Sequence, residues 1–461
     1  MLIDNIIVGA YLLVILFIGC WSCRKVKNLE EFSVASRSYP AWIIFATLSA
    51  SFIGGGFSTG NAEKVFVLGI ANIAALWGFS LKELLVAKFI APRSGMFATA
   101  ISTGDIMRLA YGKTGQVVTG FFSVLLCAGI VGAQVGAMGI VFKVFMGIEP
   151  LTGILIGCGI VIVYSTLGGM RAIVLTDVIQ FFVLGIGIPV ALILGIVKAG
   201  GPSAVISSVP ASHFAIPATG MTVAGFVSLF LTFLLGETLV PPYVQRLFIG
   251  KDSKHTARGT WYSGWFSIPF FAITGLMGLV ALSLKPDLDP NLAMPYVIQE
   301  ALPLGLRGVV VAGVISIVMS SADSFLNGAS TGCVKDIIIP LRRQPLEPRT
   351  ELILAKLVNA GTGILAVVFA IRISSILDIL ILAYNFWAPI ILVPLTAVFL
   401  GTKTSRAGFI AGATGGVAST LAWNTFLKET TCIDGLVIGV LCNLTLFYIG
   451  TRFLTPQSPE E

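Results

Sequence analysis

The chain has 461 residues, of which 56% are hydrophobic and only 11% are charged, and its formal net charge is +7. A soluble domain usually carries about 25% charged residues, so the composition excludes an ordinary soluble protein. It indicates an all-α protein that crosses the membrane many times. The connections between apolar stretches are too short for a folded soluble domain. Residues 1–461 are therefore expected to form a single transmembrane domain.

Apolar runs long enough to cross a lipid core of about 30 Å occur thirteen times along the chain. They lie near 5–22, 41–60, 66–90, 116–146, 150–166, 172–198, 222–248, 259–283, 304–334, 351–371, 375–400, 406–425 and 433–453. The first run has basic residues after it rather than before it, which is the wrong charge order for a signal peptide. It is expected to be a retained span with its N-terminus outside the cell.

With this orientation, Lys and Arg concentrate in the cytoplasmic connections, for example between Arg342 and Arg349. The positive-inside rule therefore predicts a multi-pass protein of the cell membrane with a cytoplasmic C-terminus. The net charge belongs to these loops and does not imply nucleic-acid binding. His213 and His255 both lie in connections, and no nucleophile–base pair or metal-ligand spacing occurs in the spans. An enzyme is not expected, nor is an obligate protein partner.

Two spans contain residues that interrupt a helix. Unpaired backbone groups in lipid cost several kcal/mol each, so a break is tolerated only where protein buries it or where it lines a wet cavity. A glycine triplet interrupts the second span, although glycines also allow close helix packing. The stretch GETLVPPYVQR puts a glutamate and two prolines into the seventh span. Helix breaks are expected at Gly54, Gly55, Gly56, Gly236, Pro241 and Pro242.

The two interrupted spans are five spans apart. Matching breaks in two five-span halves are typical of inverted-repeat secondary transporters, which hold solute and ions at the breaks. The halves are expected at 41–198 and 222–400. The first span, 5–22, and the last two, within 406–453, are expected to be peripheral.

The ninth span carries a cluster of hydroxyl groups in the stretch ISIVMSSADSFLN. The spacing i, i+3, i+4, i+7 places on one helical face Ile317, Ser320, Ser321 and Ser324. Hydroxyls together with carbonyls freed by a helix break offer the oxygen ligands that hard cations prefer. Membrane serines also bond back to carbonyls of their own helix, which is the alternative. Asp177 has two possible roles: it takes part in ion binding, or its negative charge interacts favourably with the N-terminal end of its helix dipole.

Five stretches resemble the sodium/solute symporter family, which includes bacterial proline, sialic acid and galactose transporters and the animal high-affinity choline transporter. In chain order they are EEFSVASRSYPAW, SASFIGGGFSTGNAEKVFVLG, YSTLGGMRAIVLTDVIQFF, PPYVQRLF and GVISIVMSSADSFLNGAS. Those around the glycine triplet and the serine cluster are most similar to the choline transporter branch. The resemblance implies a LeuT-type fold with a 5+5 inverted repeat.

The resemblance also assigns ion ligands. It implies a principal Na⁺ site made of Ala50, Ile53, Ile317, Ser320 and Ser321, the first three through their carbonyls. Family members with a second Na⁺ use the residues that match Asp177 and Ser324. Asp323 replaces a serine at the remaining position of that second site, so the number of Na⁺ ions per cycle stays open.

Solute-facing residues are expected at the breaks and on the spans packed beside them. The candidates are Phe52, Phe57, Phe79, Glu83, Gln134, Glu237, Val240 and Asn385. The choline-binding aromatic cage of the family carries over only in part: Phe52, Phe79 and Val240 stand at its positions, where Phe offers a weak π face and Val240 offers none. Glu237 suits contact with an amine-bearing solute. Two alternatives are that it pairs with Lys82 or that it caps the N-terminus of a half-helix.

The sequence thus predicts Na⁺-coupled symport of a small organic solute, such as an amine or an amino acid, into the cell by alternating access. Within transport, the alternative is H⁺ coupling through Asp177, Asp323 or Glu237. The alternative from another class is a transporter-like membrane sensor. Na⁺, the solute and membrane lipid are the expected partners.

Overall fold

The computed structural model describes residues 2–370 and 383–453, and nearly all regular structure in them is helical. The one exception is an isolated bridge between Tyr39 and Gly250. Part of the span expected at 375–400 lies outside the described residues.

Ten α-helices lie within the described residues 2–248. They are α1 (Leu2–Ser22), α2 (Leu29–Val34), α3 (Ala41–Phe52), α4 (Gly55–Leu68), α5 (Ala71–Leu85), α6 (Thr103–Met146), α7 (Pro150–Lys198), α8 (Pro202–Ser208), α9 (Val223–Leu235) and α10 (Pro241–Phe248).

The second half continues with another series of helices. They are α11 (Ser253–Leu284), α12 (Ala293–Ala301), α13 (Leu306–Thr331), α14 (Ile339–Leu341), α15 (Pro348–Ala370), α17 (Val393–Leu400), α18 (Arg406–Phe426), α19 (Lys428–Thr431) and α20 (Gly435–Phe453). Shorter 3₁₀ or π turns are η1 (Cys23–Lys25), η2 (Ala35–Arg37), η3 (Val86–Ile90), η4 (Ala91–Phe97), η5 (Ala211–Phe214), η6 (Pro290–Leu292), η7 (Gly332–Ile338) and η8 (Ala388–Leu392).

The predicted number of thirteen spans is not confirmed. Among the described residues, eight helices are long and apolar enough to cross a membrane, or nine if the bent pair α3–α4 is one span. α7 covers both spans predicted at 150–166 and 172–198, and its backbone leaves the helical conformation between them, at Gly169, with a φ of 52°. A Cβ there would lie 2.6 Å from the carbonyl oxygen of Phe32, so this close approach also requires glycine.

A second difference concerns the end of the second span. We predicted it near residue 60, but α4 continues to Leu68 and the next helix begins at Ala71. The helix ends where Gly69 takes a φ of 72°, which is a left-handed conformation that glycine adopts without strain. Hydropathy did not predict that the helix continues past residue 60, because α4 contains polar residues.

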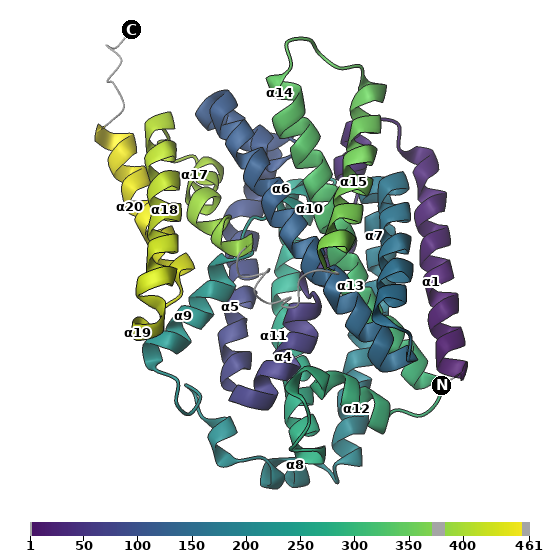
Figure 1. Cartoon of the computed structure of the whole chain (residues 1–461). Helices are drawn as coiled ribbons and strands as arrows, with labels where there is room; N and C mark the ends of the chain where they lie inside the picture. The colour runs from purple at the N-terminus through teal and green to yellow at the C-terminus, as the bar shows by residue number, and fades with distance from the viewer. Residues whose placement is uncertain (1, 371–382, 454–461) are drawn as a thin grey trace.

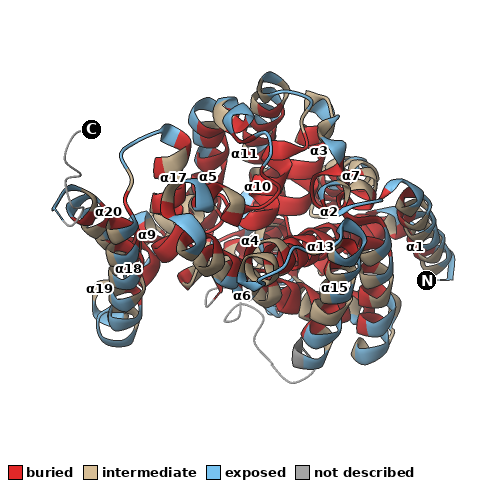
Figure 2. Ribbon diagram, turned by 90° about the horizontal axis from the view of Figure 1, so that it is seen from above, coloured by how far each residue is buried: buried red, intermediate tan, exposed pale blue. Residues whose placement is uncertain are grey.

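α13 is the central helix of the bundle. Other parts of the protein bury 94% of its most apolar stretch, whereas the buried share of the corresponding stretch is 28% for α1 and 39% for α20. It packs against α1, α3, α6, α7 and α15, and Figure 2 shows it within the buried red centre. α1 and α20 are thus much less buried by other helices than α13 is.

The start of α1 and the end of α20 lie at opposite ends of the bundle (Figure 1). The connection between α14 and α15 lies at the same end as the end of α20. This connection carries Arg342 and Arg343. The α14–α15 connection and the start of α1 therefore lie at opposite ends of the bundle.

Candidate functional site

The second span is broken where the glycine triplet predicted it. α3 ends at Phe52, α4 begins at Gly55, and the two helices are bent by 54°. Gly54 has an extended backbone, and local hydroxyls satisfy carbonyls near the break. Ser58 donates to the Gly54 carbonyl at 3.0 Å, and Thr59 donates to the Gly55 carbonyl at 2.7 Å. The break is buried in protein, which is the condition for tolerating it in a membrane.

The seventh span is also interrupted. α9 ends at Leu235, and α10 begins only at Pro241. Between them Leu239 has a φ of 54°, a conformation that a branched aliphatic residue rarely adopts. The indole nitrogen of Trp387 donates to the Thr238 carbonyl at 3.2 Å. The prolines start a new helix, where a missing backbone donor costs little.

The end of α3 meets the serine cluster of α13. The Ser321 hydroxyl donates to the Ser51 carbonyl at 2.8 Å, and the Ser324 hydroxyl lies 3.1 Å from the Ser51 hydroxyl. A Cβ added to Gly54 would lie only 2.6 Å from the Ser321 hydroxyl oxygen. The five residues predicted to bind Na⁺ are all buried, and they are Ala50, Ile53, Ile317, Ser320 and Ser321. The tertiary structure therefore places the hydroxyls of α13 beside the carbonyl-bearing end of α3.

The residues of the predicted second cation site also lie together, but they surround an arginine. Arg246 of α10 pairs with Asp177 at 3.0 Å, and the same Nη2 nitrogen donates to the Ser324 hydroxyl at 2.6 Å. It also donates to the Ser51 hydroxyl at 2.5 Å. Both ends of the ion pair are fully buried. A buried charge requires a partner, and here Arg246 and Asp177 supply it to each other.

Asp323 occupies the edge of this cluster. It accepts hydrogen bonds from the Tyr164 hydroxyl, at 2.5 Å, and from the Ser324 hydroxyl, at 3.0 Å. Sequence reasoning missed Arg246 and Tyr164. The sequence does contain a signal for Arg246. The stretch PPYVQRLF places this basic residue inside an apolar span, where a charge needs a buried acid as its partner.

The predicted solute residues form an aromatic group and a polar group. The Phe57 ring lies 5.2 Å from the Phe79 ring, and the Phe52 ring lies 5.1 Å from that of Tyr243. Val240 is fully buried at the start of α10. The aromatic group thus joins both helix breaks to α5.

The polar group contains buried acceptor atoms. Glu237 accepts a hydrogen bond from the Tyr384 hydroxyl through Oε1. Its Oε2 atom has no hydrogen-bond partner among the described residues, and neither have Gln134 Oε1 and Asn385 Oδ1. Lys82 pairs with Glu83 at 2.8 Å, and among the described residues it makes no ion pair with Glu237, although its charge acts on that carboxylate. Glu237 does not cap α10 either, because the N-cap is Val240 and makes no side-chain bond.

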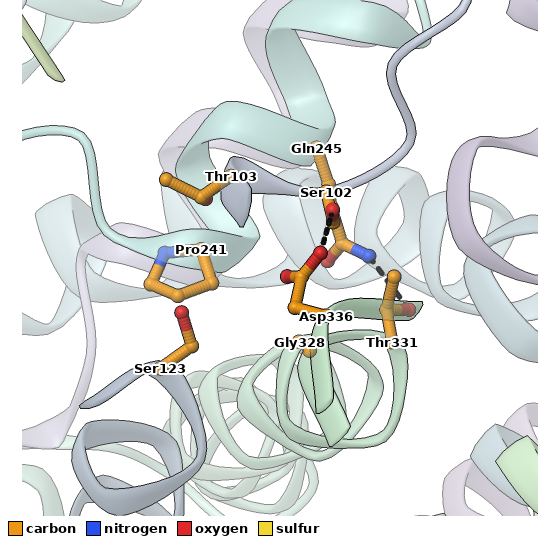
Figure 3. A pocket seen from close by; sticks show the side chains of 9 residues that line it. Ser102, Thr103, Ser123, Pro241, Gln245, Gly328, Thr331 and Asp336 are labelled. Atoms are coloured by element: carbon orange, nitrogen blue, oxygen red, sulfur yellow. Dashed lines mark hydrogen bonds between the residues drawn. The ribbon is translucent and has the colours of Figure 1, made fainter. Parts of the chain in front are cut away.

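A narrow pocket lies beyond the second break, where the start of α6 meets α10 and the end of α13 (Figure 3). Its lining is Ser102, Thr103, Ser123, Pro241, Gln245, Gly328, Thr331, Gly332 and Asp336. Figure 3 shows Ser102 pointing at Asp336, with a hydrogen bond of 2.5 Å, and Gln245 pointing at Thr331. The sequence analysis did not single out Asp336, since it follows the serine cluster without a motif of its own.

Two broken spans around buried hydroxyls and carbonyls are typical of secondary transporters. The comparison with known proteins makes this class specific. The model of the sodium:solute symporter family matches residues 32–416, and the chain belongs to that family. It is a family of transporters rather than enzymes.

Curated relatives are distant in sequence. Solute carrier family 5 member 4 of Rattus norvegicus is 24% identical to this chain. The match covers 76% of this chain but only 59% of the length of that relative. The high-affinity proline transporter PutP of Bacillus subtilis is 24% identical over 97% of both chains. The high-affinity choline transporter 1 of Caenorhabditis elegans is 22% identical, and the match covers 87% of this chain and 74% of the length of that transporter.

A solved structure of a Na⁺-coupled sialic acid symporter, in a substrate-bound outward-open state, is similar over 98% of both chains. The TM-score is 0.85 and the sequence identity is 20%. At this identity the similarity establishes the fold and nothing about ligands. The predicted fold class is therefore confirmed, although the number of thirteen spans is not.

Proposed function

We propose that the protein is a Na⁺-coupled symporter that carries a small organic solute into the cell by alternating access. The observation that carries this proposal is the contact between Ser321 of α13 and the carbonyl of Ser51 at the end of α3. It joins a broken helix to an unbroken central helix at a point rich in oxygen atoms. Such a point suits a hard cation.

In this proposal Na⁺ is a transported ion held by the carbonyls of Ala50, Ile53 and Ile317 and by the hydroxyls of Ser320 and Ser321. Bound Na⁺ would hold α3 against α13 and stabilise the state in which the two helices are close. A ligand shifts a conformational equilibrium only by its difference in affinity between the two states. Coupling therefore requires that this contact opens when Na⁺ leaves.

We infer that a single Na⁺ is bound in each cycle. The second predicted site, at Asp177, Asp323 and Ser324, contains the guanidinium of Arg246. That guanidinium already provides a positive charge beside Asp177, so it would repel a second Na⁺ there.

The solute is proposed to be rich in hydrogen-bond donors, as an amine or an amino acid is. Support comes from Glu237, whose buried Oε2 has no partner among the described residues. Unpaired buried acceptors are costly, and a donor on the solute would remove this cost. The amide oxygens of Gln134 and Asn385 offer two further acceptors. Phe57 and Phe79 would contact the apolar part of the solute.

The proposed arrangement places the repeats 41–198 and 222–400 on either side of this site. The N-terminus would be outside the cell and the C-terminus in the cytoplasm. The position of Arg342 and Arg343 at the end of the bundle opposite the start of α1 supports this orientation.

The test is the thermal stability of the purified protein in NaCl and in KCl at equal ionic strength. A ligand at 100 times its dissociation constant stabilises a protein by about 2.7 kcal/mol, which a melting curve detects. We expect Na⁺ to stabilise the wild type and not the Ser321→Ala variant. Ser330→Ala is the matched control, because Ser330 is equally buried on the same helix and, among the described residues, its hydroxyl donates only to the Asn327 carbonyl.

Compounds are then added in each salt: small amines, amino acids, sugars and carboxylates. Extra stabilisation that occurs only in Na⁺ identifies the coupled solute. Equal melting temperatures of the wild type in NaCl and KCl would contradict Na⁺ coupling and favour H⁺ coupling or a sensor. Loss of the Na⁺ effect in both serine variants would show that the effect does not depend on the predicted site.

A further inference from the structure

An ammonium group of the chain itself lies among three aromatic rings at the edge of the proposed solute site. The Lys82 Nζ atom is 3.6 Å from the centroid of the Phe79 ring, 4.7 Å from that of Tyr243 and 5.7 Å from that of Phe52. Lys82 is 1% exposed, and the three rings are buried as well. Nζ has no hydrogen-bond partner of good geometry among the described residues.

A carboxylate completes this group. Glu83 Oε1 lies 2.8 Å from Lys82 Nζ, and Glu83 Oε2 accepts a hydrogen bond of 3.0 Å from the Tyr243 hydroxyl. Aromatic faces combined with a buried carboxylate are the groups by which proteins recognise ammonium ions. We call Phe52, Phe79, Glu83 and Tyr243 the ammonium cage.

The ammonium cage is continuous with the proposed solute site. Phe57, which follows the first helix break, packs on Phe79 with ring centroids 5.2 Å apart. Phe52 is the last residue of α3, and Tyr243 belongs to the helix that follows the second break. A solute that reaches the breaks therefore comes next to the cage.

We propose that Lys82 is a specificity residue: its ammonium group occupies the ammonium cage and excludes quaternary ammonium ions from it. Two positive charges a few ångströms apart repel each other strongly in a buried site. Removing the Lys82 side chain would leave Glu83 and the rings of Phe79 and Tyr243 free to bind a quaternary ammonium ion, beside the Phe52 ring, which also lies 5.5 Å from the Arg246 guanidinium carbon. The inference rests on the proposed function for the position of the solute site.

The experiment measures the melting temperature of purified variants against tetramethylammonium chloride, with choline chloride as a second probe and KCl at matched ionic strength. We expect Lys82→Ala to be stabilised in a saturable way. Its half-saturating concentration should be at least about tenfold below any effect on the wild type, since a desolvated cation–π contact contributes that much. Lys88→Ala is the matched control, because Lys88 also lies over a ring, 5.2 Å from the Phe89 centroid, but is exposed.

Lys82→Ala removes the positive charge that pairs with Glu83, which leaves a buried carboxylate without an ion pair and destabilises the fold of this variant. The double variant Lys82→Ala/Glu83→Gln removes both charges and keeps the three rings. We expect it to respond to tetramethylammonium more weakly than the single variant. A wild type that responds as strongly as Lys82→Ala would overturn the proposal, as would folded variants that do not respond at all.

These measurements are made in both NaCl and KCl, which separates two kinds of failure. If the wild type shows no preference for Na⁺ but Lys82→Ala still binds tetramethylammonium, the Na⁺ coupling fails and the cage inference stands. If Na⁺ stabilises the protein and no Lys82 variant binds an ammonium ion, the cage inference fails alone.

Discussion

A methyl group on Gly54 tests the ion site through its geometry. The backbone of Gly54, with φ −69° and ψ −179°, is open to any residue, so Gly54→Ala introduces no backbone strain. The added Cβ would lie 2.6 Å from the Ser321 hydroxyl oxygen, whereas the next nearest polar atom, Gln134 Nε2, is 3.6 Å away. The perturbation therefore acts mainly on one hydroxyl.

The expected magnitude follows from this contact. Cβ atoms essentially never approach another heavy atom to less than 3.0 Å, so the Ser321 hydroxyl has to turn away from the Ser51 carbonyl. Losing that hydrogen bond costs about 1 kcal/mol. Losing the hydroxyl as an ion ligand as well should weaken Na⁺ binding by about 1.4 kcal/mol or more, which is tenfold in affinity.

The assay is a titration of the melting temperature with NaCl at constant ionic strength. Gly55→Ala is the matched control, because its Cβ would meet Gln134 Oε1 at 3.5 Å and Val318 Cγ2 at 3.7 Å, which are ordinary contacts. We expect Gly54→Ala to need about ten times more Na⁺ for half of the effect. The same Na⁺ dependence in the two variants would refute the placement of Ser321 at the ion site.

Two further predictions concern buried charges. Asp177→Asn and Arg246→Gln should each lower the free energy of unfolding by about 3–5 kcal/mol, because each leaves a buried charge unpaired, and the double variant should lose much less than the sum. Thermal unfolding of the four proteins checks this, and additive losses would show that the two residues do not stabilise each other. Glu237→Gln should remove most of the Na⁺-dependent stabilisation by amines, about tenfold in affinity or more, because a charged hydrogen bond is replaced by a neutral one. Its melting temperature without solute should change little, since the new amide oxygen still accepts from Tyr384, and unchanged amine binding would exclude Glu237 as the amine ligand.

The sequence by itself determined the class of protein and the location of the helix breaks. These features depend on short stretches: a glycine triplet or a pair of prolines changes the backbone wherever it occurs. The serine spacing in the ninth span likewise places its hydroxyls on one face of any helix. The tertiary structure agrees, because Ser320, Ser321 and Ser324 all contact Ser51.

Hydropathy was less informative about the number of spans. Its windows respond to apolar length and do not detect a polar helix such as α4 that continues through the predicted boundary, whereas the gap predicted between 150–166 and 172–198 does contain the break at Gly169. The extent of each span is decided by which neighbours bury its polar residues. For example, Asn61 in α4 donates to the Phe271 carbonyl of α11 at 2.8 Å.

Only the tertiary structure decided how the buried charges pair. Arg246 and Asp177 are 69 positions apart and meet because α10 packs beside α3 and α13, near α7. Lys82 and Glu83 are neighbours in sequence, and adjacent residues on a helix normally point in different directions. They pair here because the Tyr243 hydroxyl holds Glu83 while three rings from α3, α5 and α10 surround the Lys82 ammonium. Sequence spacing describes directions along one helix, whereas the partner of a buried charge depends on the helices that surround it.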